Sequence, residues 1–404
     1  MGIGLVNLLV IILGCLVAVC LTISDDSIAR FNVLDYGAVG DGKHDDSDAF
    51  TRAWKDFCMV DAQIAVFHIP RDMLFLLKPV EFSGPCKARK LDFQIFGDLV
   101  MPKMEYWDDK DKGGAWIFFA FVQGLVMYGN GHVDGQGSDW WVDGGERYRP
   151  TAIIFHHCSY LQIHGLKIVN PPKIHIKISR CSNVRFSLLH LTAPESSSNT
   201  DGIDISHSIN VDIQDSFIGT GDDCIAMING CSNINIANIA CGPGHGISVG
   251  SLGGHGQYDT VEGVKVTNCK FTGTSNGVRI KTVPGGSGYA RNITFENIIF
   301  ESVENPIIID QFYSYAGSKN QVTPKNKAVS VSDIIYKNIS GSSLSTSGIT
   351  LHCSDAVPCT GIVMDQVNIT LHNTRHRTNK IYSDCSNAQG HSTSTFPPVQ
   401  CLQE

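Results

Sequence analysis

The sequence lacks any block of basic residues. Its 404 residues include 31 Lys and Arg against 39 Asp and Glu, which gives a net charge of −8. Nucleic acids and anionic membrane surfaces bind through clustered positive charge, so neither is expected as a partner. A CxxC pair is also missing and the histidines do not have zinc-finger spacing, which argues against a metal site. The 40 glycines show no G-X-Y period, which excludes collagen and favours a turn-rich β protein.

After the N-terminus, the chain has no apolar run long enough to cross a bilayer. Residues Ile3–Ile23 carry no charged side chain, and small residues near Ser24 offer a cleavage position, so the segment is typical of a secretory signal peptide. A membrane anchor is the alternative, because about 20 apolar residues can span a bilayer as a helix. We expect residues 1–24 to be removed, leaving a single secreted domain over residues 25–404 with no stable membrane association.

Cleavage near Ser24 leaves twelve cysteines, an even number that indicates disulfide bonds in an oxidising compartment. The close pairs Cys353/Cys359 and Cys385/Cys401 are natural candidates, whereas the connectivity of the others stays open. Three N-x-[ST] sequons lie beside strand-like segments and agree with an exported glycoprotein. They are Asn292, Asn338 and Asn368.

Long helical periodicity is absent after residue 150, and short alternating runs recur in its place. Examples are NVRFSLLHL, NVDIQDSFI and NINIANIAC, each followed by a second short strand such as GIDIS, CIAMI or GISVG. Their starts lie about 23 to 38 residues apart, a spacing typical of a solenoid whose coils each contain two to four strands. We predict an all-β, right-handed parallel β-helix. A β-sandwich is the alternative, but its strands would not recur in such consistent pairs.

A solenoid has open ends that need covers. The segment DDSDAFTRAWKDFC, from Asp45, predicts an N-terminal capping helix with Asp45 or Asp46 as its N-cap. The apolar residues on one face of this helix are Ala49, Phe50, Ala53, Trp54 and Phe57. Calcium binding by the acidic residues 41–48 is the weaker reading, because their spacing does not match an EF-hand. The tail from about Ser383 is predicted to be an irregular terminal cover.

Four short polar strings interrupt the aliphatic strands where coils turn. They are Asn199-Thr200-Asp201, Gly221-Asp222-Asp223, Gly244-His245-Gly246 and Arg279-Ile280-Lys281. The separations of 21 residues from Asp201 to Asp222 and of 23 residues from Asp222 to His245 each equal about one coil. The side chains are therefore predicted to stack on one face of the solenoid.

Three stacked carboxylates cannot ionise independently, so we expect one to keep its proton while another is ionised. Hydrolysis of a glycosidic bond needs both states, an acid for the leaving oxygen and a base for water. His245 can tune the acid through a charge-assisted hydrogen bond. Arg279 and Lys281, two positions apart on one strand, share a face and offer two cations to an anionic substrate.

In this order and spacing, NTD, GDD, GHG and RIK resemble the motifs of the polygalacturonases, family 28 of the glycoside hydrolases, and of the secreted plant enzymes in particular. The resemblance runs from about Phe31, where FNVLDYGAVGDGKHDDSDAF is similar to the family's opening, to the terminal cysteines. It implies a pectin-lyase-like right-handed β-helix that hydrolyses α-1,4-galacturonan in pectin or polygalacturonate with inversion, in the extracellular space or cell wall. We expect a monomer without a cofactor or metal.

The resemblance also implies a role for each motif residue. Asp222 would be the general acid, Asp201 and Asp223 would hold and activate the attacking water, and His245 would support the acid. The substrate-binding residues would be Arg279, Lys281, Tyr313 and Asn199. Asp134 in GHVDGQG also fits the family, but we assign it to a turn.

Two departures from the family pattern are Phe312, where many plant members carry a polar residue, and Val283, where an aromatic residue is common. Both are expected at the edge of the cleft, and they leave endo or exo action open. The alternatives are a Ca²⁺-dependent pectate lyase of the same architecture, a rhamnogalacturonan hydrolase and a catalytically silent wall-binding protein. A lyase needs carboxylates grouped as metal ligands, whereas here a histidine and an Arg/Lys pair complete the cluster.

Overall fold

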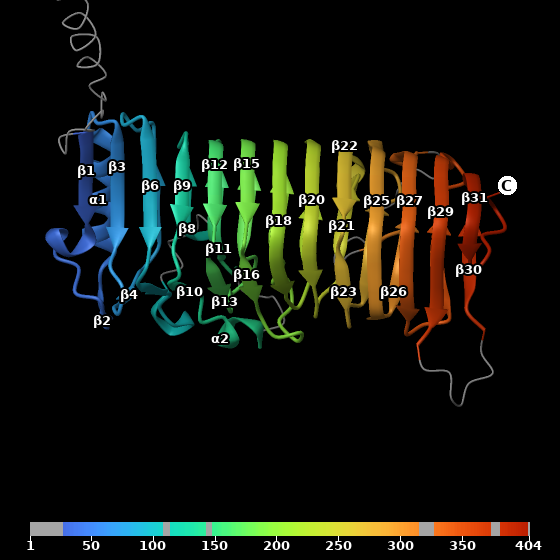
Figure 1. Ribbon diagram of the computed structural model, residues 1–404, viewed down its shortest axis with the longest axis horizontal. Helices are drawn as coiled ribbons and strands as arrows, with labels where there is room; N and C mark the ends of the chain where they lie inside the picture. Colours follow the sequence, from blue (N-terminus) through green and yellow to red (C-terminus); the bar gives the residue numbers. More distant parts are fainter. Residues whose placement is uncertain (1–26, 108–113, 143–147, 315–326, 373–379, 403–404) are drawn as a thin grey trace, which may run out of the picture.

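The computed structural model describes residues 27–107, 114–142, 148–314, 327–372 and 380–402. Within these ranges the strands of successive coils stack in parallel along one long axis, as Figure 1 shows. The predicted right-handed parallel β-helix is confirmed. The predicted signal peptide lies outside the described residues. No helix in the described ranges is both long and apolar enough to cross a membrane.

Three rows of strands form the walls of the solenoid. The first row contains β1 (Ile28–Asn32), β3 (Ile64–Ile69), β6 (Lys90–Ile95), β9 (Leu125–Tyr128), β12 (Ser159–His164), β15 (Ser182–Ser187), β18 (Ile209–Gly219), β20 (Cys231–Cys241), β22 (Tyr258–Thr267), β25 (Ser287–Val303), β27 (Ser330–Ser343), β29 (Cys359–Leu371) and β31 (Ala388–Phe396).

The second row begins with short strands and is continued by the ends of β18, β20 and β25. Its short strands are β2 (Asp41–Asp45), β4 (Leu74–Leu76), β7 (Asp98–Val100), β10 (His132–Asp134), β13 (Lys167–Val169), β16 (His190–Thr192) and β23 (Lys270–Thr272). The third row is a separate sheet of β5 (Val80–Ser83), β8 (Ala115–Ala120), β11 (Thr151–His156), β14 (Ile176–Ser179), β17 (Ile203–Ser206), β19 (Ile225–Met227), β21 (Ile247–Leu252), β24 (Asn276–Thr282), β26 (Asn305–Asp310), β28 (Ser347–His352) and β30 (Tyr382–Ser386).

The parallel register places like residues above one another in the core. Along the third row Ile153, Ile176, Ile203, Ile225 and Ile247 are successive register partners, and all are buried. Burying such a side chain contributes about 1.5–3 kcal/mol, so each coil stabilises the next. The alternating sequence runs therefore become a continuous aliphatic column, and their polar residues face outward.

The predicted capping helix is confirmed as α1 (Ser47–Met59), whose five predicted apolar residues are all buried. Asp46 precedes the helix, but its carboxylate accepts hydrogen bonds from the Val39 and Gly40 amides and not from the first turn of α1. The other helical turns are short. They are α2 (Ser138–Trp141), η2 (Val33–Tyr36), η3 (Met104–Tyr106) and η4 (Gly254–Gly256).

The C-terminal segment differs from the prediction of an irregular cover. Residues Tyr382–Ser386 and Ala388–Phe396 form β30 and β31, which pair with β28 and β29 as a further coil. The prediction was wrong because the segment is rich in Ser and Thr and has few apolar residues, which hides the alternation of a strand.

The disulfides Cys353–Cys359 and Cys385–Cys401 are confirmed, and Cys58–Cys86 and Cys224–Cys241 also form. Four of the twelve cysteines stay as buried thiols, contrary to the expectation from the even count. They are Cys158, Cys181, Cys231 and Cys269. A buried thiol packs as a small apolar side chain, so core positions can hold cysteine without a bond. The three sequon asparagines are exposed, as expected.

Candidate active site

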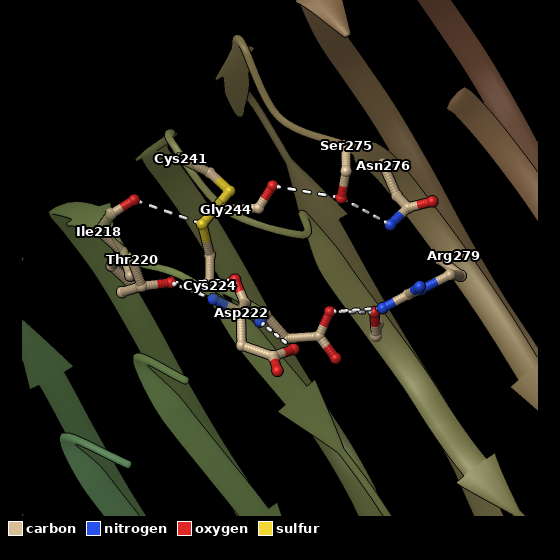
Figure 2. Close-up of a disulfide and its surroundings, with 11 residues drawn as sticks. Ile218, Thr220, Asp222, Cys224, Cys241, Gly244, Ser275, Asn276 and Arg279 are labelled. Atoms are coloured by element: carbon tan, nitrogen blue, oxygen red, sulfur yellow. Dashed lines mark hydrogen bonds and ion pairs between the residues drawn. A yellow bond between two sulfur atoms is a disulfide. The ribbon is translucent and has the colours of Figure 1, made fainter. Parts of the chain in front are cut away.

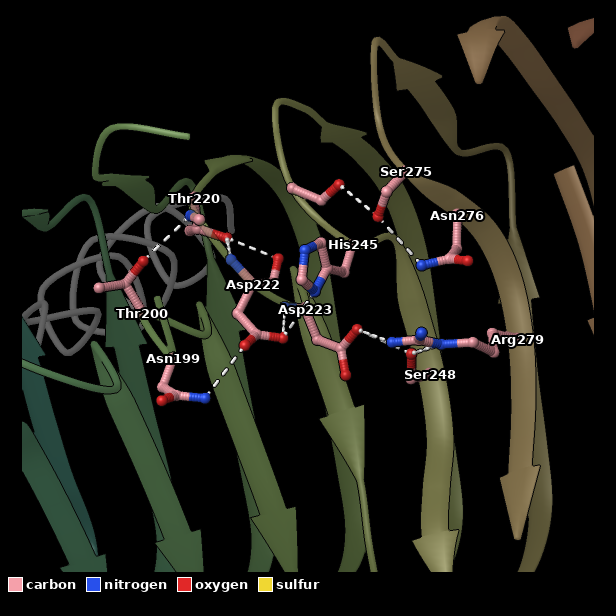
Figure 3. Close-up of polar contacts among 12 residues, drawn as sticks. Asn199, Thr200, Thr220, Asp222, Asp223, His245, Ser248, Ser275, Asn276 and Arg279 are labelled. Atoms are coloured by element: carbon pink, nitrogen blue, oxygen red, sulfur yellow. Dashed lines mark hydrogen bonds and ion pairs between the residues drawn. The ribbon is translucent and has the colours of Figure 1, made fainter. Parts of the chain in front are cut away.

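The turns that connect the second and third rows bring the four polar strings together. Asn199 lies between β16 and β17, Asp222 and Asp223 between β18 and β19, and His245 between β20 and β21. Arg279 extends from the neighbouring strand β24 toward the same cluster, as Figure 3 shows. The predicted stacking of these strings on one side of the solenoid is therefore observed.

Backbone contacts between consecutive turns fix the cluster. The Gly221 amide donates to the Thr200 hydroxyl at 3.0 Å, and the His245 amide donates to the Asp222 carbonyl at 2.7 Å. Gly246 has φ +82°, and a Cβ there would collide with the Gly277 carbonyl, so this position requires glycine. The Cys224–Cys241 disulfide ties the residue after Asp223 to the next coil (Figure 2).

Asp222 is the centre of the hydrogen-bond network. Its Oδ1 lies 3.0 Å from His245 Nδ1 and accepts the Asp223 amide at 2.9 Å, while Asn199 Nδ2 donates to its Oδ2 at 3.3 Å. Burial alone would raise the pKa of Asp222, but the hydrogen bond and charge of His245, with the charge of Lys281, outweigh it and lower that pKa. In the free protein this carboxylate therefore favours its ionised form.

Asp223 is buried, with 2% exposure, and is compensated by two cations. Arg279 Nη2 donates to its Oδ1 at 2.7 Å, and Lys281 Nζ donates to its Oδ2 at 2.9 Å. The Ser248 hydroxyl also donates to Oδ1 and accepts from Arg279 Nε. Arg279 and Lys281 do share one face as predicted, but in the free protein they are ion-paired, because an uncompensated carboxylate would not be stable at this depth.

Asp201 and Asp204 behave in the opposite way to Asp222. Burial, followed by repulsion from Asp204, Asp222 and Asp223, raises the pKa of Asp201 well above its usual value. Burial and repulsion from Asp223, opposed by Lys177 on the adjacent strand β14, raise the pKa of Asp204 to about 7. Asp201 and Asp204 therefore keep their protons to higher pH than Asp222 does.

The motif strings did not reveal Asp204 or Arg149. Asp204 follows Asp201 by three residues in NTDGID, and its buried Oδ1 has no hydrogen-bond partner among the described residues. Arg149 is also buried, and its guanidinium donates to Asn199 Oδ1 at 2.6 Å and to the Ser198 carbonyl at 2.7 Å. The only signal for Asp204 was a charge at a strand position, and Arg149 comes from a loop about 50 residues earlier without a motif.

The remaining predicted residues are divided between the cluster and its surroundings. Lys281 Nζ lies 5.2 Å from the centre of the Tyr313 ring, so Tyr313 joins the cluster. Phe312 is exposed as expected for a cleft edge, but Val283 is buried, so its side chain does not line an open edge. Asp134 accepts the Gln136 amide at 3.0 Å, which confirms its turn role.

Asp222, Asp223 and His245 place potential metal-ligand atoms within 4.8 Å of one another. Their existing contacts do not suit a metal ion. Both Asp223 oxygens accept hydrogen bonds from cations, and those cations would repel a divalent ion. The chemistry that fits this arrangement is proton transfer beside a docking position for an anionic group.

Comparisons with known proteins agree with this geometry. The chain matches the model of glycosyl hydrolases family 28 over residues 59–394. It is 48% identical to a probable polygalacturonase of Arabidopsis thaliana, over 92% of this chain and 80% of the relative. It is 41% identical to polygalacturonase-2 of Solanum lycopersicum, over 86% and 76% of the two chains.

Solved structures show the same fold at low sequence identity. An endo-xylogalacturonan hydrolase from Aspergillus tubingensis has a TM-score of 0.74 at 24% identity, covering 93% of this chain and 99% of that one. A polygalacturonase from Erwinia carotovora ssp. carotovora has a TM-score of 0.68 at 21% identity, covering 90% and 96%. With the family model spanning most of the chain, the protein belongs to family 28 of the glycosyl hydrolases and is a glycoside hydrolase related to plant polygalacturonases.

Proposed function

We propose that the protein hydrolyses α-1,4-galacturonosyl linkages of polygalacturonate, with inversion, as a secreted monomer of the extracellular space or cell wall. In this proposal residues 1–24 are removed and residues 25–404 form one catalytic domain. The relatives named polygalacturonase support the substrate class. The observation that carries the proposal is the contact of Arg279 and Lys281 with Asp223 directly beside Asp222, because two cations next to a candidate acid suit a substrate that carries a carboxylate.

The proposed roles follow the family resemblance. Asp222 protonates the leaving oxygen, Asp201 and Asp223 hold and activate water, and His245 supports Asp222. Arg279 and Lys281 bind the substrate carboxylate, with Tyr313 and Asn199 beside them. Arg149 is added here as a positioning residue, since its hydrogen bond to Asn199 Oδ1 orients the amide that donates to Asp222.

Protonation of Asp222 must be linked to substrate binding. In the free protein its pKa is lowered while the pKa values of Asp201 and Asp204 are raised. An incoming galacturonate carboxylate adds a negative charge beside the cluster and competes with Asp223 for Arg279 and Lys281. Both effects raise the pKa of nearby carboxyl groups, including Asp222. The carboxyl groups share their protons, so a proton held on Asp201 or Asp204 in the free protein can then reside on Asp222.

The direct test is release of reducing ends from polygalacturonate by the wild-type protein and by Asp222→Asn. We expect the variant to lose at least about 100-fold in kcat, because it cannot donate the proton. Asp212→Asn, an exposed aspartate on the same coil outside the cluster, is the matched control and should retain full activity. Near-normal turnover by Asp222→Asn would show that Asp222 is not the general acid.

The pH profile tests the shared proton independently. The cluster keeps a proton at acidic pH because the pKa of Asp201 is raised, and the pKa of Asp204 is raised to about 7. Activity should therefore peak at acidic pH and fall as the pH rises through these values. A profile that peaks above pH 8 would contradict a protonated acid in the cluster.

Chelation and product absorbance separate this proposal from calcium-dependent elimination. A hydrolase should keep its activity in EDTA and release products without the ultraviolet absorbance of an unsaturated sugar. Loss of activity in EDTA, together with absorbing products, would support the lyase alternative. The anomeric configuration of the first product, followed by proton NMR, tests inversion.

A further inference from the structure

A second polar groove lies toward the N-terminal end of the solenoid, away from the candidate active site. It has a volume of about 650 Å³ and is formed by the first four coils. Its lining residues come from β2, β4 and the turns that follow β4, β7 and β10. They include Lys43, Asp45, Lys78, Lys103, Tyr106 and Gln136.

The charge of this groove is opposite to that of the whole protein. Three lysines line it against the single carboxylate of Asp45, in a chain whose net charge is −8. Lys78 Nζ pairs with Asp45 Oδ2 at 3.1 Å, whereas Lys43 and Lys103 form no ion pair within the described part of the chain. The Tyr106 side chain is 67% exposed, so its ring is open to a ligand in the groove. Two available ammonium groups beside an open ring fit a sugar that carries carboxylates.

The groove and the candidate active site lie on the same edge of the solenoid. Backbone amides at the ends of the second-row strands donate from one coil to the next along this edge, from Met101 to the Asp134 carbonyl, from Gly135 to Val169 and from Asn170 to Thr192. The series continues from Ala193 to Gly219 and from Thr220 to Pro243. Gln136 directly follows the donor Gly135, and Asp222 lies two residues after the donor Thr220.

Coils of parallel strands lie about 4.8 Å apart. Three coils therefore separate Gln136 from Asp222 by roughly 14 Å, and Lys103 lies about one coil further away. In Figure 1 the strands of this edge, from β2 and β4 through β10, β13 and β16, follow one another in a line toward β18. A linear polymer that extends along the solenoid axis from Asp222 toward the N-terminal coils passes α2, which lies on the same edge, and then meets the groove.

We propose that this groove is a distal docking site for the same uronate polymer whose bond is cleaved at Asp222. Lys43 and Lys103 pair with carboxylates of distant sugar residues, and the Tyr106 ring packs against a sugar face. The inference rests on the proposed function for the identity of the polymer. It explains how an acidic enzyme retains a polyanionic chain beyond the reach of Arg279 and Lys281.

The test measures binding in the full mature protein with Asp222→Asn as an inactive background, so that turnover does not interfere. Affinities for decagalacturonate and trigalacturonate are measured by titration calorimetry, with and without Lys43→Gln and Lys103→Gln together. We expect the double substitution to weaken binding of the decamer at least about fivefold, because two exposed ion pairs are lost. The affinity for the trimer, which is too short to reach from Asp222, should not change. The loss should shrink at high salt.

Lys55→Gln with Lys87→Gln is the matched control, since both lysines are exposed, lie outside the groove and give the same change in net charge. An equal loss in the control, an equal loss for the trimer, or no loss for the decamer would overturn the docking site. Poly-glutamate that binds as tightly as the decamer, with the same dependence on Lys43 and Lys103, would also overturn it in favour of a general polyanion surface. If the wild-type protein did not cleave polygalacturonate but the lysine-dependent decamer binding persisted, the proposed function would fail and the docking site would stand.

Discussion

The buried carboxyl groups of the candidate site are compensated unevenly. Asp223 has two cations and a hydroxyl group around it, whereas the buried Oδ1 of Asp204 has no hydrogen-bond partner among the described residues. These two residues should therefore affect stability in opposite directions when each is replaced by the neutral amide.

Asp204→Asn should stabilise the protein at high pH. The pKa of Asp204 is raised to about 7 in the folded state, so its contribution to stability is fully present below the unfolded value near 4 and is lost as the pH rises through about 7. The variant should match wild type at pH 4 and exceed it on the order of 2–4 kcal/mol at pH 8 in urea unfolding. Asp212→Asn should show no such trend. A difference between Asp204→Asn and wild type that does not depend on pH would contradict the raised pKa.

Asp223→Asn should destabilise the protein strongly. Removing this carboxylate leaves Arg279 and Lys281 buried without a partner, which costs about 3–5 kcal/mol for comparable buried pairs. Asp222→Asn is the matched comparison, because Asp222 is more exposed and is paired through a half-exposed His245. It should cost no more than about 1 kcal/mol. Equal losses of unfolding free energy in the two variants would show that the ion pairs of Asp223 with Arg279 and Lys281 do not stabilise the fold more than the contacts of Asp222 do.

Motif spacing predicted that the candidate residues lie together on one side of the solenoid, but not how their side chains pair. A separation of one coil is enough to predict that Asp201, Asp222 and His245 stack, since a solenoid repeats its geometry. The ion pairs of Asp223 depend on side-chain direction at β21 and β24, 25 to 58 residues further along the chain. Arg149 reaches the cluster from a loop with no repeat, so no period in the sequence could reveal it.

At the scale of elements, the disulfide Cys224–Cys241 holds the turn that carries Asp222 and Asp223. Cys224 follows Asp223 directly, and its amide donates to the Gly246 carbonyl beside His245 at 2.8 Å. Replacing both cysteines by alanine should lower the unfolding free energy by about 3 kcal/mol, given the 17-residue separation. It should also lower kcat, because the two turns lose their fixed spacing.

The matched control replaces Cys353 and Cys359, whose disulfide has a separation of 6 residues and lies several coils from the site. That variant should lose less stability and keep its kcat in the reducing-end assay. Equal kcat in the two double variants would mean that the Cys224–Cys241 disulfide does not position the acid.

One corner of the coils is formed by asparagines, which the composition alone does not reveal. The 40 glycines favoured a turn-rich β protein, but Asn183, Asn210 and Asn233 occupy one corner of the coils with φ between 54° and 57°. The side-chain amide of Asn233 donates to Asn210 at 2.7 Å, and that of Asn210 donates to Asn183 at 3.1 Å. Asparagine tolerates the left-handed conformation and adds a hydrogen bond between coils, which glycine cannot do.

At the scale of the whole molecule, the ends of the solenoid decide which coils open first. Coils contact mainly their neighbours, so stability is close to a sum of coil and interface terms, and an end without a cover frays. At the N-terminal end Trp54 of α1 packs against Phe57, Phe82 and the rings beneath, and its Nε1 donates to the Ser83 carbonyl at 3.1 Å. The cap therefore closes the first coils both by packing and by a hydrogen bond.

Trp54→Ala should remove about 3–5 kcal/mol from the N-terminal coils by leaving a cavity under the cap. Hydrogen exchange measured by mass spectrometry should show faster exchange in β1, β3 and β6, while β25 and β27 keep their protection. Trp54→Phe, which retains much of the packing but not the Ser83 hydrogen bond, should give a smaller change in the same strands. Uniform loss of protection along the chain would show that the solenoid unfolds as one cooperative unit and that the cap stabilises all coils together.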